Sequence, residues 1–416
     1  MELRRQPHAF KTELDPTEPQ KAALKAHADA SRFAYNWGLQ RKIEVMNLNK
    51  LPLEHINIPT AMDLHKELVR LKHTQYRWLE EVSKCAPQEA LRDLDAAFKN
   101  FYRNHRGFPR FKSKRWTKKS FTITGEKITV ADNCVRLPIL GWVKLKEDGY
   151  LLPEGAVHIK AATVSERAGR WFVSLNVEED VEPVVNHGPV VGIDLGINHL
   201  IAVSDGTFIE NPKALSHGER RLKHIQRSVS RKKAGSHNRA KAVQRLARAH
   251  LKIANIRKDA INKATTRLAR SKSVIVIEAL NVAGMMKNHH LAKSVADAAF
   301  GEIRRQLERK TVWYGSRLVK VDRFFPSTKQ CSQCGFVKTS MPLSERTFRC
   351  PSCGFEADRD YNASKTLEEQ WPSVRWTLET PVEEGVQLDF FSVQPSREAG
   401  NATLAGQQPV RVCLRC

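Results

Sequence analysis

The spacing of apolar residues divides the first part of the chain into strands and helices. Residues 9–14 and short alternating runs between residues 120 and 181 have the two-residue period of half-buried strands. The intervening block repeats apolar side chains at helical spacing, over residues 18–40, 59–71 and 87–103. We therefore expect a small antiparallel sheet or β-barrel interrupted by a helical unit, with Phe33 and Trp37 in a core stripe.

The second part of the chain begins with an apolar strand that carries an acid. Residues 190–206 combine two apolar runs with a glycine turn and an Asp-Gly ending, which predicts a β-hairpin. Asp194 lies in the first run, and a carboxylate buried in an apolar strand costs several kcal/mol unless it has a partner. That partner can be a hydrogen-bond donor, a cation or a metal ion. Gly196 indicates that another group approaches the backbone closely at this point.

Two further acids lie at the ends of predicted elements. Residues 274–277 are wholly apolar and are followed by Glu278, which is typical of a buried parallel strand with a functional group at its carboxyl end. Asp360 lies at the start of a predicted helix, in which Asp358 is a candidate N-cap. If they converge with Asp194, these carboxylates can hold two Mg²⁺ or Mn²⁺ ions about 4 Å apart for phosphodiester hydrolysis. The chain has no glycine-rich phosphate loop, which argues against an ATPase.

Four cysteines have the spacing of metal ligands. They form two C-x-x-C pairs separated by fifteen residues: Cys331 and Cys334, then Cys350 and Cys353. This pattern predicts a closed tetrahedral zinc site of the zinc-ribbon type over residues 331–354, and two matched pairs disfavour the alternative of a redox dithiol. A third pair, Cys413 and Cys416, has no companion and is either a metal half-site or an incidental doublet. It belongs to residues 371–416, whose mixed charge and lack of periodicity predict disorder.

The charge of the chain indicates a polyanionic partner. The net charge of +24 and the pI near 9.8 favour nucleic acid. Residues 211–272 contain 19 Lys or Arg against two acids, in two predicted helices that join near Gly235. A solvated helical surface is the alternative there. Residues 107–116 interleave aromatic rings with cations, which indicates either a nucleic-acid contact or a basic linker.

Several classes of protein and of element are disfavoured. No apolar run approaches the ~20 residues needed to span a bilayer, and the N-terminus lacks the apolar core of a secretory signal. We therefore expect a cytoplasmic protein without a membrane partner, in which cysteines ligate metal rather than form disulfides. No helix-turn-helix able to read a long DNA sequence is evident.

Towards the end of the second part of the chain, a single helix is predicted over residues 294–314, followed by a strand over residues 317–321.

A set of motifs, in this order, resembles the transposon-encoded TnpB (OrfB) family, whose RuvC-type nuclease is related to the type V CRISPR effectors. The motifs are GIDLGINHLIAVSDG, VIVIEALNVAGM, CSQCG with CPSCG, and DRDYNASKTL. The N-terminal half adds SRFAYNWGL, QEALRDLDAAFKNFYR, GFPRFKSK and RLPILGWVKLK. The resemblance covers residues 8 to 370 and is specific, because independent motifs keep their order.

The resemblance implies an α/β multidomain architecture. Its RNase H-like RuvC nuclease domain would comprise residues 188–330 and 355–370, with the zinc ribbon as an insertion. A wedge-type β-barrel would comprise residues 1–19 and 106–187, and the inserted helical recognition lobe residues 20–105.

The resemblance also implies the site and the partners. Catalytic acids that bind Mg²⁺ or Mn²⁺ would be Asp194, Glu278 and Asp360, and the zinc ligands would be Cys331, Cys334, Cys350 and Cys353. The implied activity is RNA-guided cleavage of double-stranded DNA beside a short adjacent motif. The implied guide is an omega RNA derived from the transposon end.

Two other functions remain open. The chain can be a nucleic-acid-binding accessory protein of transposition whose nuclease fold does not cut, or a transposase that uses the same metal chemistry for strand transfer. The three acids favour the endonuclease, because a module that only binds nucleic acid does not need them.

Overall fold

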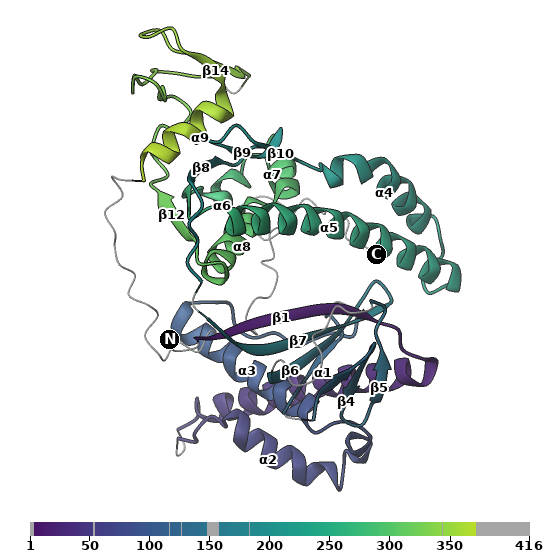
Figure 1. Cartoon of the computed structure of the whole chain (residues 1–416). Coiled ribbons are helices and arrows are strands. Elements are labelled where there is room, and N and C mark those ends of the chain that lie inside the picture. Colours follow the sequence, from purple (N-terminus) through teal and green to yellow (C-terminus); the bar gives the residue numbers. More distant parts are fainter. Residues whose placement is uncertain are drawn as a thin grey trace. The chain divides into compact units, whose positions relative to one another are not determined.

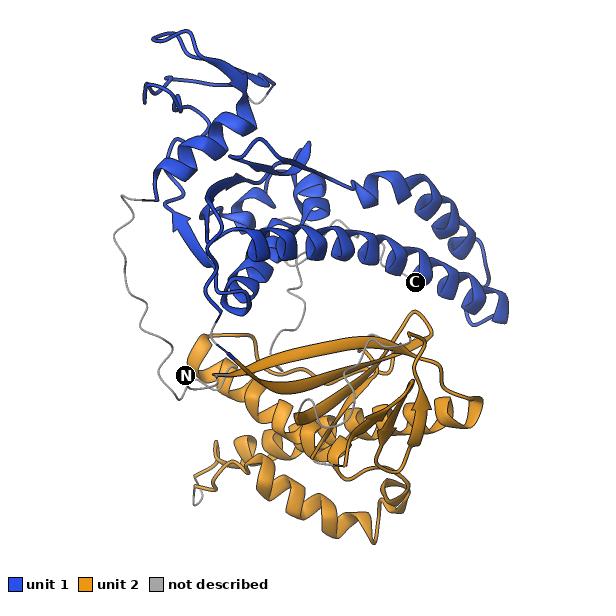
Figure 2. Ribbon diagram, in the orientation of Figure 1, with its two compact units in different colours: residues 1, 182–383, 416 blue, residues 2–181, 384–415 orange. Residues whose placement is uncertain are grey.

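The structure is a computed structural model that describes residues 4–52, 55–115, 117–125, 127–147, 158–182, 184–342 and 344–371. The chain divides into two compact units, with the boundary between Val181 and Glu182 (Figure 2). The expectation of a disordered tail and the pair Cys413 and Cys416 fall outside the described residues. In the described part of the chain, each helix is too short or too polar to cross a membrane.

The unit before residue 182 contains two antiparallel sheets (Figure 1). The larger sheet has the strand order β1-β7-β6-β2 and the smaller one β3-β4-β5. The strands are β1 (Arg4–Leu14), β2 (Ser120–Thr124), β3 (Thr129–Ala131), β4 (Cys134–Leu137), β5 (Gly141–Lys144), β6 (His158–Arg167) and β7 (Arg170–Val181). Because β1 pairs with β7 from Arg4 to Leu14, the first strand belongs to the same sheet as strands far along the chain, as the sequence predicted.

The two sheets enclose one hydrophobic core. Ile123 and Val173 of the larger sheet and Val135 and Val143 of the smaller one belong to the same buried cluster. Strands β3 to β5 are three or four residues long and pair with one another. The smaller sheet meets the larger one through a single bridge between Leu14 and Leu145, within the described residues. Of the two predicted alternatives, the described residues form antiparallel sheet, as two sheets around a shared core.

The predicted helical unit is inserted between β1 and β2. It consists of α1 (Glu18–Leu48), α2 (Ala61–Lys72), the 3-10 helix η1 (Arg77–Glu81) and α3 (Cys85–Asn104). Helices α1 and α3 approach closely at Gly38, where a Cβ would lie 2.6 Å from a methyl group of Leu91. Tyr35 is buried in this core. The prediction for Phe33 and Trp37 is correct only in part, because both are half-buried at the edge of the core.

The unit after residue 182 is built on a mixed sheet of order β10-β9-β8-β11-β12 (Figure 1). Its strands are β8 (Val190–Asp194), β9 (His199–Val203), β10 (Phe208–Glu210), β11 (Val274–Glu278) and β12 (Arg317–Val321). Strands β8, β11 and β12 are parallel, whereas β9 and β10 continue the sheet as antiparallel strands. The predicted hairpin, the predicted parallel strand β11 and the predicted strand over residues 317–321 are thus present.

Helices cover both faces of this sheet. The helices of the unit are α4 (Ala214–Ser230), α5 (His237–Ser271), α6 (Val282–Met285), α7 (Ala292–Ala298), α8 (Phe300–Trp313) and α9 (Arg359–Glu369). Ile275 and Ile277 of β11 pack in one cluster with side chains of α5 and α8. Val274 and Val276, which alternate with them, pack on the other face with Leu367 of α9. This alternation explains why β11 is apolar from Val274 to Ile277.

One predicted helix is wrong. The sequence predicts a single helix over residues 294–314, but the structure has two helices, α7 and α8, that meet at Ala299. Ala299 adopts a left-handed conformation with φ of +53°, which a continuous right-handed helix cannot contain. Its N–H donates to the carbonyl of Val295 and its carbonyl accepts from Glu302, so the same residue ends one helix and begins the next.

Candidate functional site

Asp194 and Glu278 lie at the same edge of the mixed sheet. Asp194 is the last residue of β8 and Glu278 the last residue of β11. The two strands are parallel neighbours in which Ile193 is paired with Ile277, the residue before each acid. The carboxyl ends of adjacent parallel strands meet at one edge, so the topology brings these two carboxylates together.

Asp360 reaches the same edge from helix α9. This helix crosses β8 at Gly192, where a Cβ would lie 2.0 Å from the carbonyl oxygen of Ser364. The absence of a side chain at Gly192 therefore allows the helix and the strand to touch. At Gly196, a Cβ would lie 3.5 Å from Oδ2 of Asp360. The close approach that the sequence predicted at Gly196 is made by the carbonyl oxygen of His199, 2.8 Å from that Cβ position, while Asp360 lies at ordinary contact distance.

Asp360 and Glu278 act electrostatically on Asp194. Burial first, and then the carboxylates of Asp360 and Glu278, raise the pKa of Asp194 to about 7. Burial also raises the pKa of Glu278, against the opposing effect of a hydrogen bond from Ser327 Oγ to its Oε2 at 3.3 Å. The negative charges of Asp360 and Glu278 thus act on Asp194 more strongly than the positive charge of Arg359.

Arg359 holds Asp360 in place and connects it to the cysteine segment. Its Nε and one terminal nitrogen donate to Oδ1 of Asp360 at 3.1 and 3.0 Å. The other terminal nitrogen donates to the carbonyl of Glu345 at 3.2 Å. Asp358 is the N-cap of α9 and accepts from the backbone N–H groups of Asp360 and Tyr361, as the sequence predicted. Asp360 is thus fixed by its neighbours on both sides.

Three residues of this site were not identified from the sequence. Gly192 lies inside a strand, and an interior strand glycine is itself a signal of close backbone approach. Ser327 lies in a loop and Arg359 in a charged helix start, where the sequence contains no pattern that marks either as a partner of an acid. Their roles follow only from the contacts with Glu278 and Asp360.

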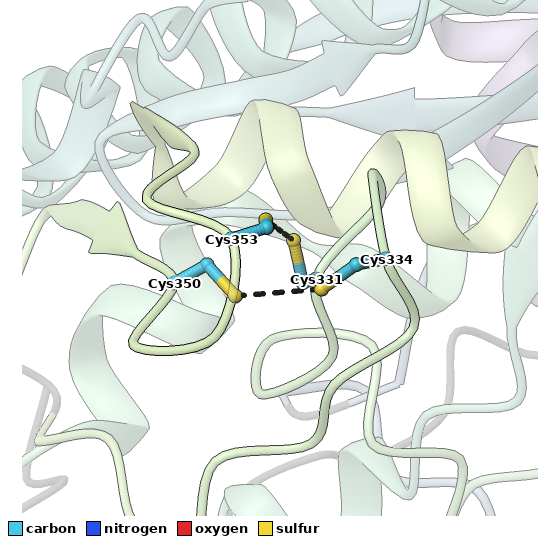
Figure 3. Close-up of side chains that lie close together, drawn as sticks. All are labelled: Cys331, Cys334, Cys350 and Cys353. Carbon is cyan, nitrogen blue, oxygen red and sulfur yellow. Dashed lines mark hydrogen bonds between the residues drawn. The ribbon is translucent and has the colours of Figure 1, made fainter.

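The four predicted metal-ligand cysteines form a cluster (Figure 3). Their sulfur atoms all lie within 4.8 Å of one another, with 3.7 Å between Cys331 and Cys353 and 3.5 Å between Cys334 and Cys350. This is the one group of possible ligand atoms within that distance among the described residues, so the three acids converge less tightly. Four thiols in this arrangement suit a tetrahedral ion.

Glycines and a small core support the cysteine cluster. Gly335 and Gly354 have φ of +74° and +72°, and each donates its N–H to the first cysteine of its pair. These are the tight turns that thiol ligands at C-x-x-C spacing require. The strands β13 (Thr347–Arg349) and β14 (Glu356–Asp358) form a hairpin, and its buried Phe348 packs with Cys331 and Cys350.

The two basic segments have different structures. The predicted pair of basic helices is confirmed as α4 and α5, joined by residues 231–236. Exposed cations recur along α5, among them Lys241, Arg245 and Arg248. In the aromatic-basic segment, Phe108 packs edge-on against Phe98 and Phe101. Phe111 instead remains exposed, and Trp116 lies outside the described residues.

Three protein-family models match the chain. A model of the OrfB family of IS605-type elements, described as "Probable transposase", matches residues 162–289. A "Cas12f1-like, TNB domain" model matches residues 300–367, which include the cysteine cluster and α9. A model described as "Helix-turn-helix domain" matches residues 3–50. In the structure, residues 4–48 form strand β1 and the single helix α1, so the described residues of this match contain no pair of helices.

Known proteins resemble the chain over most of its length. A Streptomyces pristinaespiralis protein named "Putative RNA-guided DNA endonuclease" is 37% identical over 86% of this chain and 88% of its own length. The Escherichia coli K12 protein of the same name, InsQ, is 32% identical over 86% of this chain and 91% of its own. A solved structure, "Cryo-EM structure of the Cas12f1-sgRNA-target DNA complex", matches with a TM-score of 0.53 at 16% identity, over 84% of this chain and 83% of that one. This last match concerns the fold, which is a mixed α/β architecture.

Proposed function

The chain belongs to the TnpB (OrfB) family, and we propose that it is a transposon-encoded, RNA-guided DNA endonuclease that depends on divalent metal ions. The observation that carries the proposal is the convergence of Asp194, Glu278 and Asp360 at one edge of the mixed sheet. We assign these acids to a RuvC-type active site on an RNase H-like sheet.

The donor set fits divalent cations. Burial, and then the carboxylates of Asp360 and Glu278, raise the pKa of Asp194 to about 7, and the charge of Arg359 offsets this only in part. Asp194, Glu278 and Asp360 would hold Mg²⁺ or Mn²⁺, ions that prefer carboxylate oxygens. Bound cations would supply charge stabilisation at the scissile phosphate and a nucleophile from water.

The remaining residues of the site position these acids. Arg359 occupies Oδ1 of Asp360 and leaves Oδ2 on the side of Gly196. Ser327 donates to Oε2 of Glu278 and so orients that carboxylate. Both contacts are made before substrate arrives, which reduces the reorganisation needed during hydrolysis.

The cysteine segment, residues 331–354, would be a structural zinc ribbon that holds α9 in place. Four thiols close a tetrahedral site and leave no position for water, as in structural zinc centres. Asn362 of α9 donates to the carbonyl of Gln330 at 2.7 Å and accepts from the N–H of Ser332 at 3.0 Å. Metal binding would thereby stabilise the helix that carries Asp360.

The basic surfaces would bind the guide RNA and the target DNA. Residues 211–272 carry 19 Lys or Arg and two acids, and α4 and α5 share only a narrow apolar contact around Leu222 and Ile253. Cations on such helices neutralise backbone phosphates of any sequence. The base sequence would then be read by pairing with the guide, and cleavage would occur beside a short motif read by the protein.

The domain roles follow from the same proposal. In the unit after residue 182, residues 188–330 and 355–370 would form the nuclease domain. In the unit before it, the two sheets would form the wedge-type domain and α1 to α3 the recognition lobe.

The proposal is tested with the full chain expressed beside its native flanking DNA and purified with any bound RNA. Double-stranded DNA that matches the RNA should be cut in Mg²⁺ and left intact in EDTA or after RNase treatment. DNA joining without hydrolysis would favour a transposase. Binding without cleavage in any divalent metal would favour the accessory protein.

A further inference from the structure

A cavity of about 520 Å³ lies on the helical unit, and neither the acids nor the cysteines are among its lining residues. Its wall is formed by one face of α1, by η1 and by the aromatic-basic segment. The lining residues are Asp29, Arg32, Phe33, Asn36, Trp37, Gln40, Trp78 and Phe111. Four of these are aromatic, and the volume lies within the usual range of small-ligand sites, roughly 300–1,000 Å³.

Two aromatic rings of the cavity are open to solvent. Trp78 is 41% exposed and Phe111 is 53% exposed. Phe33 meets Trp78 edge-on with 5.3 Å between ring centroids, which fixes the Trp78 ring at the rim. Exposed aromatic faces of this kind are the surfaces on which nucleobases stack.

The segment that carries Phe111 is held firmly against α1. Asn36 donates from Nδ2 to the carbonyl of Lys112 at 2.9 Å and accepts from the N–H of Lys112 at 2.7 Å. The ammonium group of Lys112 lies 3.7 Å from the centroid of the Tyr35 ring. These contacts position the neighbouring Phe111 without using its own ring, which therefore remains available to a ligand.

The charge around the cavity fits a phosphate-containing ligand. Residues 106–115 contain five Lys or Arg and no acid. The one acid of the lining, Asp29, accepts from Arg32 at 2.9 Å, so its charge is already compensated. Arg32 has further N–H donors that can meet the polar edge of a base.

We propose that this cavity binds one unpaired nucleobase between the rings of Trp78 and Phe111, with the flanking phosphates on the cations of residues 106–115. The base is unpaired because the faces of a base inside a duplex are already covered by its neighbours. It belongs either to the guide RNA or to a displaced strand of the target DNA, which offer the same chemistry. The inference rests on the proposed function for the identity of these partners.

The test uses the full-length chain in EDTA with single-stranded RNA, single-stranded DNA and duplex oligonucleotides that contain 5-iodouracil. Ultraviolet light should crosslink the single strands to peptides that contain Trp78 or Phe111, and the duplex far less. Whichever single strand, RNA or DNA, gives the stronger crosslink identifies the nucleic acid that supplies the bound base. Equal crosslinking of single strand and duplex at these peptides, or none, would overturn the proposal.

Substitutions give an independent readout. Phe111→Ala should weaken single-strand binding by roughly 5- to 150-fold, the usual range for one stacked base, whereas Phe111→Tyr should retain it. Trp142→Ala removes a similarly exposed ring on β5, 46% exposed, and should leave affinity unchanged. If Phe111→Ala and Trp78→Ala bind and cut like the wild type, the cavity has no such role and the proposed function still stands. Absence of RNA binding by the wild-type protein would instead contradict the proposed function.

Discussion

Asp194, Glu278 and Asp360 are the residues on which the proposed chemistry depends, because each comes from a different element and all three lie at one edge of the sheet. Burial and the carboxylates of Asp360 and Glu278 raise the pKa of Asp194 to about 7. A protein has no structural reason to place two acids beside a buried Asp194, since hydrogen-bonded neutral side chains would cost less. The arrangement is therefore best explained by cations that the acids bind.

Substitution of each acid tests this directly. Asp194→Ala, Glu278→Ala and Asp360→Ala should each reduce guided DNA cleavage at least about 10³-fold, because charge stabilisation by bound metal contributes several kcal/mol. Nucleic-acid affinity should change little, since the cations of α4 and α5 remain. Asp358→Asn is the matched control, because Asn also caps a helix and should preserve cleavage. A variant of the three that still cuts normally does not belong to the site.

The raised pKa of Asp194 also makes a prediction about stability without metal. Its pKa rises from 3.8 to about 7 on folding, so between these values the folded protein binds more protons than the unfolded chain. In EDTA, stability should thus fall as the pH increases from about 4 to about 7, by at most about 1.4 kcal/mol per pH unit. The measurement is the free energy of unfolding of the wild type minus that of Asp194→Asn, determined at several pH values across this range. A difference that is flat with pH would show that Asp194 is not perturbed.

Among the helices and strands, the contact between α9 and β8 sets the distance between Asp360 and Asp194. Gly192→Ala would place a Cβ 2.0 Å from the carbonyl of Ser364 and 2.5 Å from the backbone nitrogen of Glu368, so the helix must move. We expect a loss of stability of about 1–3 kcal/mol. Cleavage should fall by about 10²-fold, since a displacement near 1 Å has effects of that size.

Gly301→Ala serves as the control for that change. Gly301 lies in α8 and has no atom within 4 Å of the position that a Cβ would take. Alanine should therefore be tolerated and slightly favoured in the helix. Unfolding curves and cleavage rates of the two variants, compared side by side, measure the effect of the α9 contact. Wild-type behaviour of Gly192→Ala would mean that α9 is free to shift.

The cysteine cluster should contain zinc. Metal analysis of the wild type should find about one zinc per chain, and Cys331→Ser or Cys350→Ser should release it, because binding at such sites stabilises the fold. Cys134→Ser removes a half-buried thiol of β4 and should leave the zinc content unchanged. Purified wild-type protein without zinc would contradict the assignment.

The sequence predicted those features that have a local chemical pattern. The apolar run before Glu278, the spacing of the four cysteines and the cap at Asp358 are such patterns, and each predicted element is present. Ala299 was missed because alanine gives no sign of the left-handed conformation that divides α7 from α8. Arg359 was missed because its partner Glu345 approaches only when the cysteine segment folds against α9.

The same limit applies to Phe33 and Trp37. Helical spacing places them on one face of α1 but does not determine what covers that face. The structure gives them a neighbouring segment, residues 107–115, that arrives from beyond α3 and leaves a cavity. The aromatic residues predicted as a core stripe, Phe33 and Trp37, therefore also form part of the wall of a cavity.

For the chain as a whole, the central question is which component selects the target DNA. The described residues that match the helix-turn-helix family model form one strand and one helix, which is not an arrangement that reads a long base sequence in a groove. The large positive charge provides affinity for backbones of any sequence. Selection by a paired guide RNA accounts for both observations.

Exchange of the guide therefore provides the decisive measurement. The protein is assembled with its RNA, whose 3′ segment is replaced by an unrelated sequence, and it is given two plasmids that match the old and the new segment beside the same short motif. Cleavage should move completely to the plasmid that matches the new segment and should require Mg²⁺. Cleavage that stays on the old plasmid, or that proceeds equally with RNA-free protein, would contradict the RNA-guided function.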